Sequence, residues 1–251
     1  MSTHIAWQGD DSELPTHAAA MFALPGVGNV GKLVLDSMLD ALPSKRLIQF
    51  HHPDMPPHAT MQDGLLQPPH IYLDSIELPD SRRILTIGGD VQPLIPRGQY
   101  EMAETILHLL QQAGTPKLYI LAGLACEAGS QAVHVIAADH STRSWLEGQG
   151  IPVSVDQPAG GVIGLCGLLA SLGPSRGVSC CTVIAETFGT SVDTAAAERL
   201  RSSLQTHFGF EIPVSLDRTD GLAEELRRNY PEGPGAMLSA ELLTSDDSFY
   251  Q

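Results

Sequence analysis

One glycine-rich turn has the spacing of a nucleotide-binding site. Gly26-Val27-Gly28-Asn29-Val30-Gly31 follows an apolar run at 20–24 and precedes apolar residues with helical spacing. Glycines spaced as G-x-G-x-x-G let backbone N–H groups approach a pyrophosphate at the start of a helix. The pattern lacks the carboxylate that would hold a ribose, because Phe50-His51 stands at the end of the next expected strand.

Lys32 gives the same turn the spacing of a phosphate-binding P-loop. That motif needs a Ser or Thr after the lysine to hold Mg²⁺, and Leu33 occupies the position. We therefore expect residues 26–31 to form a structural turn that packs a strand against a helix. We also expect Lys32 to bind no phosphate.

A second glycine-rich run opens another expected helix. Gly160-Gly161-Val162-Ile163-Gly164-Leu165-Cys166-Gly167 could offer N–H groups to an anion at a helix N-terminus. The run contains no Lys or Arg to hold a phosphate. Its small residues favour close packing of a helix on the sheet or on another subunit.

The titratable residues form no recognisable catalytic pattern. Four histidines lie in or beside a proline-rich segment: His51, His52, His58 and His70. They lack metal-site spacing, so we expect a solvated loop over 51–69 and no metal. Asp139-His140 and Glu186-Thr187 follow strands. A histidine beside an acid could transfer a proton, but we interpret Asp139-His140 as a helix cap. With no G-x-S-x-G elbow, we expect no catalytic residue and no cofactor.

Composition narrows the classes of partner. The 251 residues include 14 Lys and Arg against 29 Asp and Glu, a formal net charge of −15. This charge opposes binding to nucleic acid or to an anionic membrane surface. Four cysteines without a CxxC pair predict reduced, buried thiols. With no basic leader and no long apolar span, we expect a cytoplasmic protein.

Apolar runs alternate with helical patterns along the chain. Expected strands cover 20–24, 46–50, 71–73, 83–89, 118–123, 133–138 and 180–185, with 71–73 antiparallel to its neighbours. Expected helices cover 33–42, 99–112, 141–149 and 193–207, with a last one ending near 229. The pattern predicts an α/β fold with a mostly parallel sheet and helices on both faces. We expect one domain over 1–230 and a flexible acidic tail over 231–251.

The end of the sequence reads as a recognition peptide. A polar, acidic stretch finishes on Phe249, Tyr250 and Gln251. Exposed aromatics cost solubility, so their place in such a tail favours a binding role. We expect Phe249 and Tyr250 to fill apolar slots in a partner and the carboxylate of Gln251 to pair with a lysine. The alternative is that the aromatic pair folds back onto the domain.

Three segments together resemble the PAC2 (proteasome assembly chaperone 2) family over residues 20–230. They are Leu24-Pro25 with the first glycine turn, the block Ile84-Leu85-Thr86-Ile87-Gly88-Gly89-Asp90-Val91-Gln92-Pro93, and the turn at 160–164. The resemblance implies a fold similar to purine nucleoside phosphorylases and assembly into homo-oligomers. The tail resembles the HbYX motif, formed here by Phe249, Tyr250 and Gln251. Such tails imply binding to α subunits of the 20S proteasome core.

Two functions follow from these observations. The first is an ATP-independent, non-enzymatic proteasome assembly chaperone or adaptor that binds the α ring through several tails at once. The second is an enzyme with a nucleotide or nucleoside pocket at the glycine-rich strand ends, near 26–31, Gly89-Asp90 and 160–164. Binding of ATP, NAD or a nucleoside would distinguish the second from the first.

Overall fold

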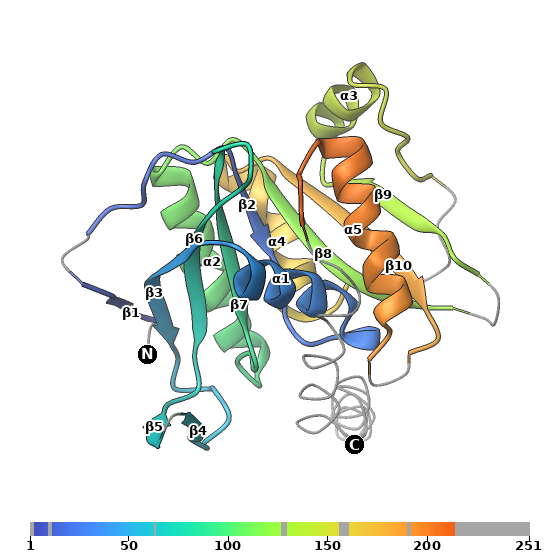
Figure 1. Ribbon diagram of the computed structural model, residues 1–251. Helices are drawn as coiled ribbons and strands as arrows, with labels where there is room; N and C mark the ends of the chain where they lie inside the picture. The colour runs from blue at the N-terminus through green and yellow to red at the C-terminus, as the bar shows by residue number, and fades with distance from the viewer. Residues whose placement is uncertain are drawn as a thin grey trace, which may run out of the picture.

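The computed structural model describes residues 3–9, 12–62, 64–126, 130–155, 161–189 and 192–213. Its main feature is an eight-stranded sheet with the order β1-β3-β6-β7-β2-β8-β10-β9 (Figure 1). The strands are β1 (His4–Trp7), β2 (Ala19–Phe22), β3 (Ser44–His51), β6 (Ile71–Glu77), β7 (Arg83–Gly89), β8 (Leu118–Ala125), β9 (Val133–Ala137) and β10 (Cys180–Thr187).

The sheet is mixed, which corrects the prediction of a mostly parallel sheet. The four central strands β7, β2, β8 and β10 pair in parallel. Strands β1, β3 and β6 on one side, and β9 on the other, pair antiparallel with their neighbours. The turn at 78–82 between β6 and β7 is too short for a parallel crossover, so these strands must run in opposite directions. The antiparallel prediction for 71–73 is confirmed.

Helices cover both faces of the sheet, as predicted. Helices α1 (Val30–Ala41) and α5 (Thr194–Phe208) lie on one face, and α2 (Pro96–Gln112) and α4 (Gly164–Leu172) on the other (Figure 1). Two apolar cores, one on each face, hold these layers to the sheet. Burial of this apolar surface is the main force that joins the layers.

Two acidic side chains begin helices as helix caps. The Asp139 carboxylate accepts a hydrogen bond from the N–H of Thr142 at 2.7 Å, at the start of α3 (His140–Gly148). Asp193 accepts from the N–H of Ala196 at 2.9 Å, at the start of α5. Capping stabilises a helix by about 1 kcal/mol. The interpretation of Asp139 as a cap is confirmed.

The expected loop over 51–69 contains a small hairpin. Strands β4 (Thr60–Gln62) and β5 (Leu65–Gln67) pair only with each other and project beyond the end of β3 (Figure 1). The edge strand β1 was not predicted either. The last expected helix, near 217–229, and the whole tail over 231–251 lie outside the described residues.

Candidate functional site

The glycine-rich segments meet at one edge of the sheet. Parallel strands end together, so β2, β7, β8 and β10 bring their carboxyl ends to the same side, where ligands bind in many α/β proteins. The 3₁₀ turn η1 (Val27–Asn29) follows β2, the loop over 90–95 follows β7, and residues 161–163 precede α4. This carboxyl edge is therefore the place to test a nucleotide site.

The first glycine turn is packed against the sheet. A Cβ added to Gly31 would lie 2.2 Å from the carbonyl oxygen of Leu121 on β8, and one on Gly123 would lie 2.1 Å from that of Val27. Neither position has room for a side chain, so the two glycines let the turn and α1 approach β8 closely. The expectation that this turn packs a helix against a strand is confirmed.

Lys32 lies in a buried ion cluster. Its Nζ is 2.8 Å from a carboxylate oxygen of Asp36 and 3.0 Å from one of Asp90, and its side chain is 5% exposed. The Tyr72 hydroxyl donates to Asp36 at 3.1 Å. Burial alone would lower the pKa of Lys32, but the charge of Asp36, with help from Tyr72 and Asp90, raises that pKa above its ordinary value. The lysine of the P-loop spacing thus already has two anionic partners within the chain.

The second glycine run also has an internal partner. The Gln92 side-chain oxygen accepts a hydrogen bond from the N–H of Leu165 at 3.1 Å, in the first turn of α4. Gly164 has a φ of 73°, and a Cβ there would meet the same oxygen at 2.8 Å. The carboxamide of Gln92 therefore occupies a place that an anion would need at this helix N-terminus.

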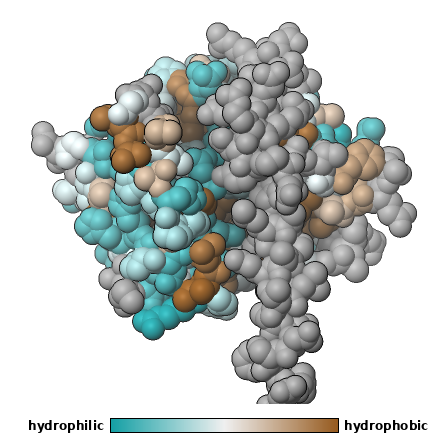
Figure 2. Space-filling view, turned by 90° about the horizontal axis from the view of Figure 1, so that it is seen from below, coloured by the Kyte–Doolittle hydropathy of each residue, from teal (hydrophilic) through white to brown (hydrophobic). Residues whose placement is uncertain are grey.

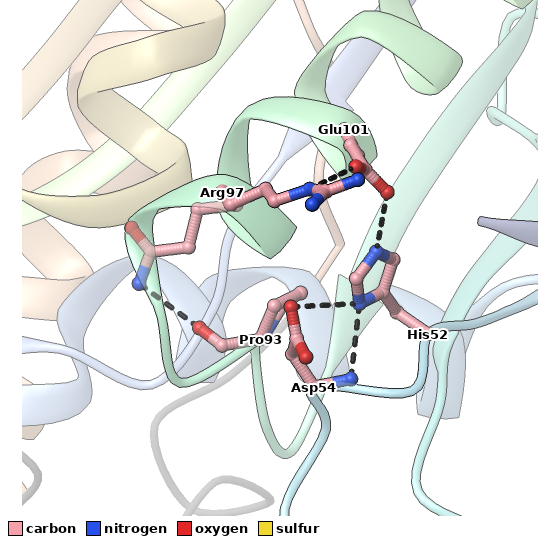
Figure 3. A network of polar contacts seen from close by, with 6 residues as sticks. His52, Asp54, Pro93, Arg97 and Glu101 are labelled. Atoms are coloured by element: carbon pink, nitrogen blue, oxygen red, sulfur yellow. Dashed lines mark hydrogen bonds and ion pairs between the residues drawn. The ribbon is translucent and has the colours of Figure 1, made fainter. Parts of the chain in front are cut away.

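A polar network fixes the loop after β3 to the start of α2 (Figure 3). The backbone N–H of Asp54 donates to Nδ1 of His52 at 3.1 Å, so Nε2 carries the proton that is donated to Glu101 at 3.1 Å. Glu101 also accepts from Arg97 at 2.8 Å, and Arg97 and then His52 hold the pKa of Glu101 below its ordinary value. The His52 ring is buried, and both its nitrogens are used within the chain. This arrangement suits an anchor rather than a proton-transfer catalyst.

A second histidine and carboxylate pair lies at the opposite end of the sheet. Nε2 of His134 on β9 is 3.1 Å from Glu186 on β10, and both side chains are buried. Glu186 also accepts hydrogen bonds from the Ser130 hydroxyl and the N–H of Ala132, and His134 Nδ1 contacts Ser154 at 3.3 Å. The Ser130 hydroxyl donates to the glutamate and not to the histidine, so Ser130 does not make the serine-to-histidine contact of a catalytic triad. Ser154, at 3.3 Å from Nδ1, is the hydroxyl that lies beside the histidine.

Histidines and cysteines form no metal site among the described residues. His51 ends β3 and His70 directly precedes β6, with their ring centres 5.9 Å apart, and His58 lies in the loop before β4. Cys180 and Cys181 are buried, and burial raises the pKa of both thiols to about 12. The prediction of buried thiols is thereby confirmed for Cys180 and Cys181. Cys126 and Cys166 are only partly buried.

The predicted binding residues Phe249, Tyr250 and Gln251 lie outside the described residues. Sequence reasoning missed the partners of Lys32, Gln92 and His52. Each partner is far away in the chain, and no local spacing signals such a contact. Within the described part of the chain, no helix is long and apolar enough to cross a membrane.

Comparison with known proteins identifies the class. The model of the PAC2 family matches residues 20–232, so the chain belongs to the PAC2 family. PbaB of Pyrococcus furiosus, an archaeal proteasome activator, shares 20% identity and a TM-score of 0.75, with 90% of this chain and 96% of that chain covered. PbaA of the same organism, an archaeal homolog of proteasome-assembly chaperone, shares 22% identity and a TM-score of 0.70, over 90% and 95%.

The chain also has a sequence relative among known proteins. The protein MJ1210 of Methanocaldococcus jannaschii is 24% identical over 189 residues, which cover 75% of this chain and 72% of that protein. At these identities the structural matches establish the fold. The similarity to purine nucleoside phosphorylases stays a prediction.

Proposed function

We propose that this protein is an ATP-independent chaperone or adaptor that binds α subunits of the 20S proteasome. The observation that carries the proposal is the PAC2 family match over residues 20–232. Two structural relatives are described as a proteasome activator and a homolog of a proteasome-assembly chaperone, which points the same way. The protein would then act by binding its partner, and it would catalyse no reaction.

The state of the carboxyl edge favours this role over an enzyme with a nucleotide site. Lys32 is paired with Asp36 and Asp90, and Gln92 caps α4. A phosphate would have to displace these internal partners before it could bind. Thermal shift with ATP, NAD and nucleosides tests the enzymatic alternative, because a ligand at 100 times its Kd adds about 2.7 kcal/mol of stability.

The proposed contact is the tail Phe249-Tyr250-Gln251. The two aromatic side chains would enter apolar pockets between α subunits, and with Gln251 as the last residue its carboxylate would pair with a lysine there. One short tail buries little area and binds weakly. Several tails on one homo-oligomer would raise the effective concentration and strengthen binding by roughly 10²–10⁴-fold.

A pull-down of the cognate 20S core, or of free α subunits, tests the tail. We expect Tyr250→Ala, or removal of residues 249–251, to abolish capture, because a buried aromatic anchor commonly contributes 2 kcal/mol or more per site, about 30-fold. Phe188→Ala is the matched control, since Phe188 is an exposed aromatic outside the tail. Capture of the α ring by Tyr250→Ala at wild-type strength would contradict the proposal.

A further inference from the structure

Four large apolar side chains are exposed together at the carboxyl edge of the sheet. Leu94 and Ile95, in the loop after β7, are each 48% exposed, Tyr100 near the start of α2 is 51% exposed, and Ile163 just before α4 is 64% exposed. We call these four residues the edge patch. The hairpin β4–β5 projects from the same edge, and in the view from that side brown apolar areas interrupt a largely teal surface (Figure 2).

The edge patch is continuous with an apolar groove. The Gln92 side chain accepts a hydrogen bond from the N–H of Leu165 at 3.1 Å, so the loop after β7 is held against the start of α4. Tyr100 and Val162 both line the groove, which has a volume of about 510 Å³ and lies between α2, α4, β9 and β10. None of the described lining residues carries a charge. Exposed apolar side chains beside an uncharged hollow are typical of a surface that binds another molecule.

The first of two negatively charged clusters borders the edge patch on the side of α2. The carbonyl oxygen of Asp54 accepts a hydrogen bond from the N–H of Leu94 at 2.8 Å, which joins the patch to the polar network in Figure 3. That network contains the carboxylates of Asp54 and Glu101 but only one guanidinium, that of Arg97. His52 adds no charge, because its Nδ1 accepts a hydrogen bond. The network therefore has one negative charge in excess.

The second cluster lies at the end of β7. Asp90 directly follows this strand, in the same loop as Leu94, and its side chain is 60% exposed. It pairs with Lys32, which also pairs with Asp36, so two carboxylates share one ammonium group. This cluster also has one negative charge in excess. The edge patch thus combines apolar side chains with a negative border.

Charge narrows the choice of occupant for this surface. The chain's own tail over 231–251 contains four acidic residues and no Lys or Arg, so the border repels it. A second copy of the chain, with a net charge of −15, and the phosphates of a nucleic acid are opposed for the same reason. An apolar segment that carries positive charge satisfies both the patch and its border.

We propose that the edge patch binds a segment of another protein in which large apolar side chains are flanked by lysine or arginine. The apolar side chains contact Leu94 and Ile163 and enter the groove, and the basic side chains lie against Asp54 and Asp90. The site belongs to the globular domain, so it goes beyond the proposed function and does not depend on the tail. With a tail bound to the proteasome, it would let the protein hold a second partner at the same time.

Fluorescence anisotropy with three labelled peptides of equal length tests the chemistry of the partner. One peptide combines leucine with lysine, the second leucine with glutamate, and the third serine with lysine. We expect the full chain to bind only the leucine–lysine peptide, because the other two lack either the positive charge or the apolar side chains. High ionic strength should weaken this binding, since the charges at the border are partly exposed and are screened by salt.

Variants locate the binding site. Leu94→Ser combined with Ile163→Ser should weaken binding of the leucine–lysine peptide by about 30-fold or more, the loss typical of central contact residues. Leu65→Ser is the matched control, because Leu65 is 63% exposed on the hairpin and lies outside the edge patch.

The charged border has its own pair of variants. Asp90→Asn should weaken peptide binding by roughly 1.5–5-fold, as expected for an exposed ion pair. Asp80→Asn, which removes an ion-paired aspartate just before β7 at the opposite edge of the sheet, should leave peptide binding unchanged.

Four results would each overturn the proposal. They are a Kd for the leucine–lysine peptide weaker than about 1 mM, equal binding of the leucine–glutamate peptide, wild-type binding by the Leu94→Ser, Ile163→Ser variant, and tighter binding after removal of residues 231–251. The last result would identify the chain's own tail as the occupant. Capture of the proteasome by the patch variant should stay at wild-type strength, so failure of this site is distinguishable from failure of the proposed function.

Discussion

Replacing Lys32 by methionine removes the cation from a buried ion cluster while keeping an unbranched side chain of similar length. Asp36, whose side chain is 16% exposed, then loses its partner at 2.8 Å. Asp90 is 60% exposed and can be solvated, and Asp36 keeps the hydrogen bond from Tyr72. Removal of one partner from a buried pair costs about 3–5 kcal/mol. Because Asp36 retains a hydrogen-bond donor and some solvent contact, we expect Lys32→Met to lower the free energy of unfolding by about 3 kcal/mol, the low end of that range.

The chain offers a matched control for burial. Arg143 and Glu147 are also four residues apart on a helix and also 2.8 Å apart, but their side chains are 48% and 52% exposed. Exposed helical pairs contribute about 0.3–0.5 kcal/mol, so Arg143→Met should lower the free energy of unfolding by no more than that. For a chain of this size, about 3 kcal/mol corresponds to a decrease in Tm of roughly 6–12 °C.

The effect of pH on this variant has a definite sign. The pKa of Lys32 is raised in the folded state, so its contribution to stability is fully present below the unfolded pKa of about 10.4 and is lost as pH rises above that value. Urea unfolding of wild type and Lys32→Met should therefore differ equally at pH 7 and 9 and differ less at pH 11. Lys32→Met combined with Asp36→Asn should recover part of the loss, because neither partner is then charged.

Two results would refute this reasoning about Lys32. One is a loss at pH 7 below about 1 kcal/mol, no larger than an exposed ion pair gives. The other is a difference between wild type and variant that stays constant up to pH 11. In either case the lysine would be solvated in the folded protein, and it would again be available to an external anion.

Two further predictions concern the same edge of the sheet. Gly31→Ala should lower the free energy of unfolding by more than about 1–3 kcal/mol, because the added Cβ meets a backbone carbonyl of β8. Gly148→Ala in α3 is the control: nothing lies within 4 Å of the added Cβ, so this change should be neutral or slightly stabilising. Thermal denaturation of the two variants checks this, and equal Tm values would contradict it. Gln92→Leu should cost about 1 kcal/mol by leaving an N–H of α4 without its acceptor, as measured by urea unfolding, and an unchanged midpoint would show that this cap contributes nothing.

Local signals in the sequence were enough to predict the main helices and the residues that begin them. Asp139 and Asp193 stand directly before segments with the pattern of a helix, and a cap acts within four residues. The glycine turn was also interpreted correctly, because Leu33 excluded a metal-binding hydroxyl and a packing role remained. These features depend only on neighbours in the chain.

Long-range pairings could not be predicted. Nothing near Lys32 indicates that Asp90, 58 positions later, supplies a second carboxylate, and nothing near His52 indicates Glu101. The hairpin β4–β5 was missed because three-residue strands are too short to show an alternating pattern. The sheet was expected to be mostly parallel because strand spacing alone does not report direction.

The strand order has a consequence for synthesis of the chain. Strand β2 (Ala19–Phe22) lies between β7 and β8, so its second neighbour is complete only when residue 125 has been made. At about 5–20 residues per second, the ribosome needs roughly 5–20 s to cover that interval. The antiparallel strands β3, β6 and β7 can pair earlier, because they are close in sequence. The apolar residues of β2 are therefore unpaired on both sides until β7 has been made, and unpaired on the β8 side until residue 125, which exposes them to aggregation in the nascent chain.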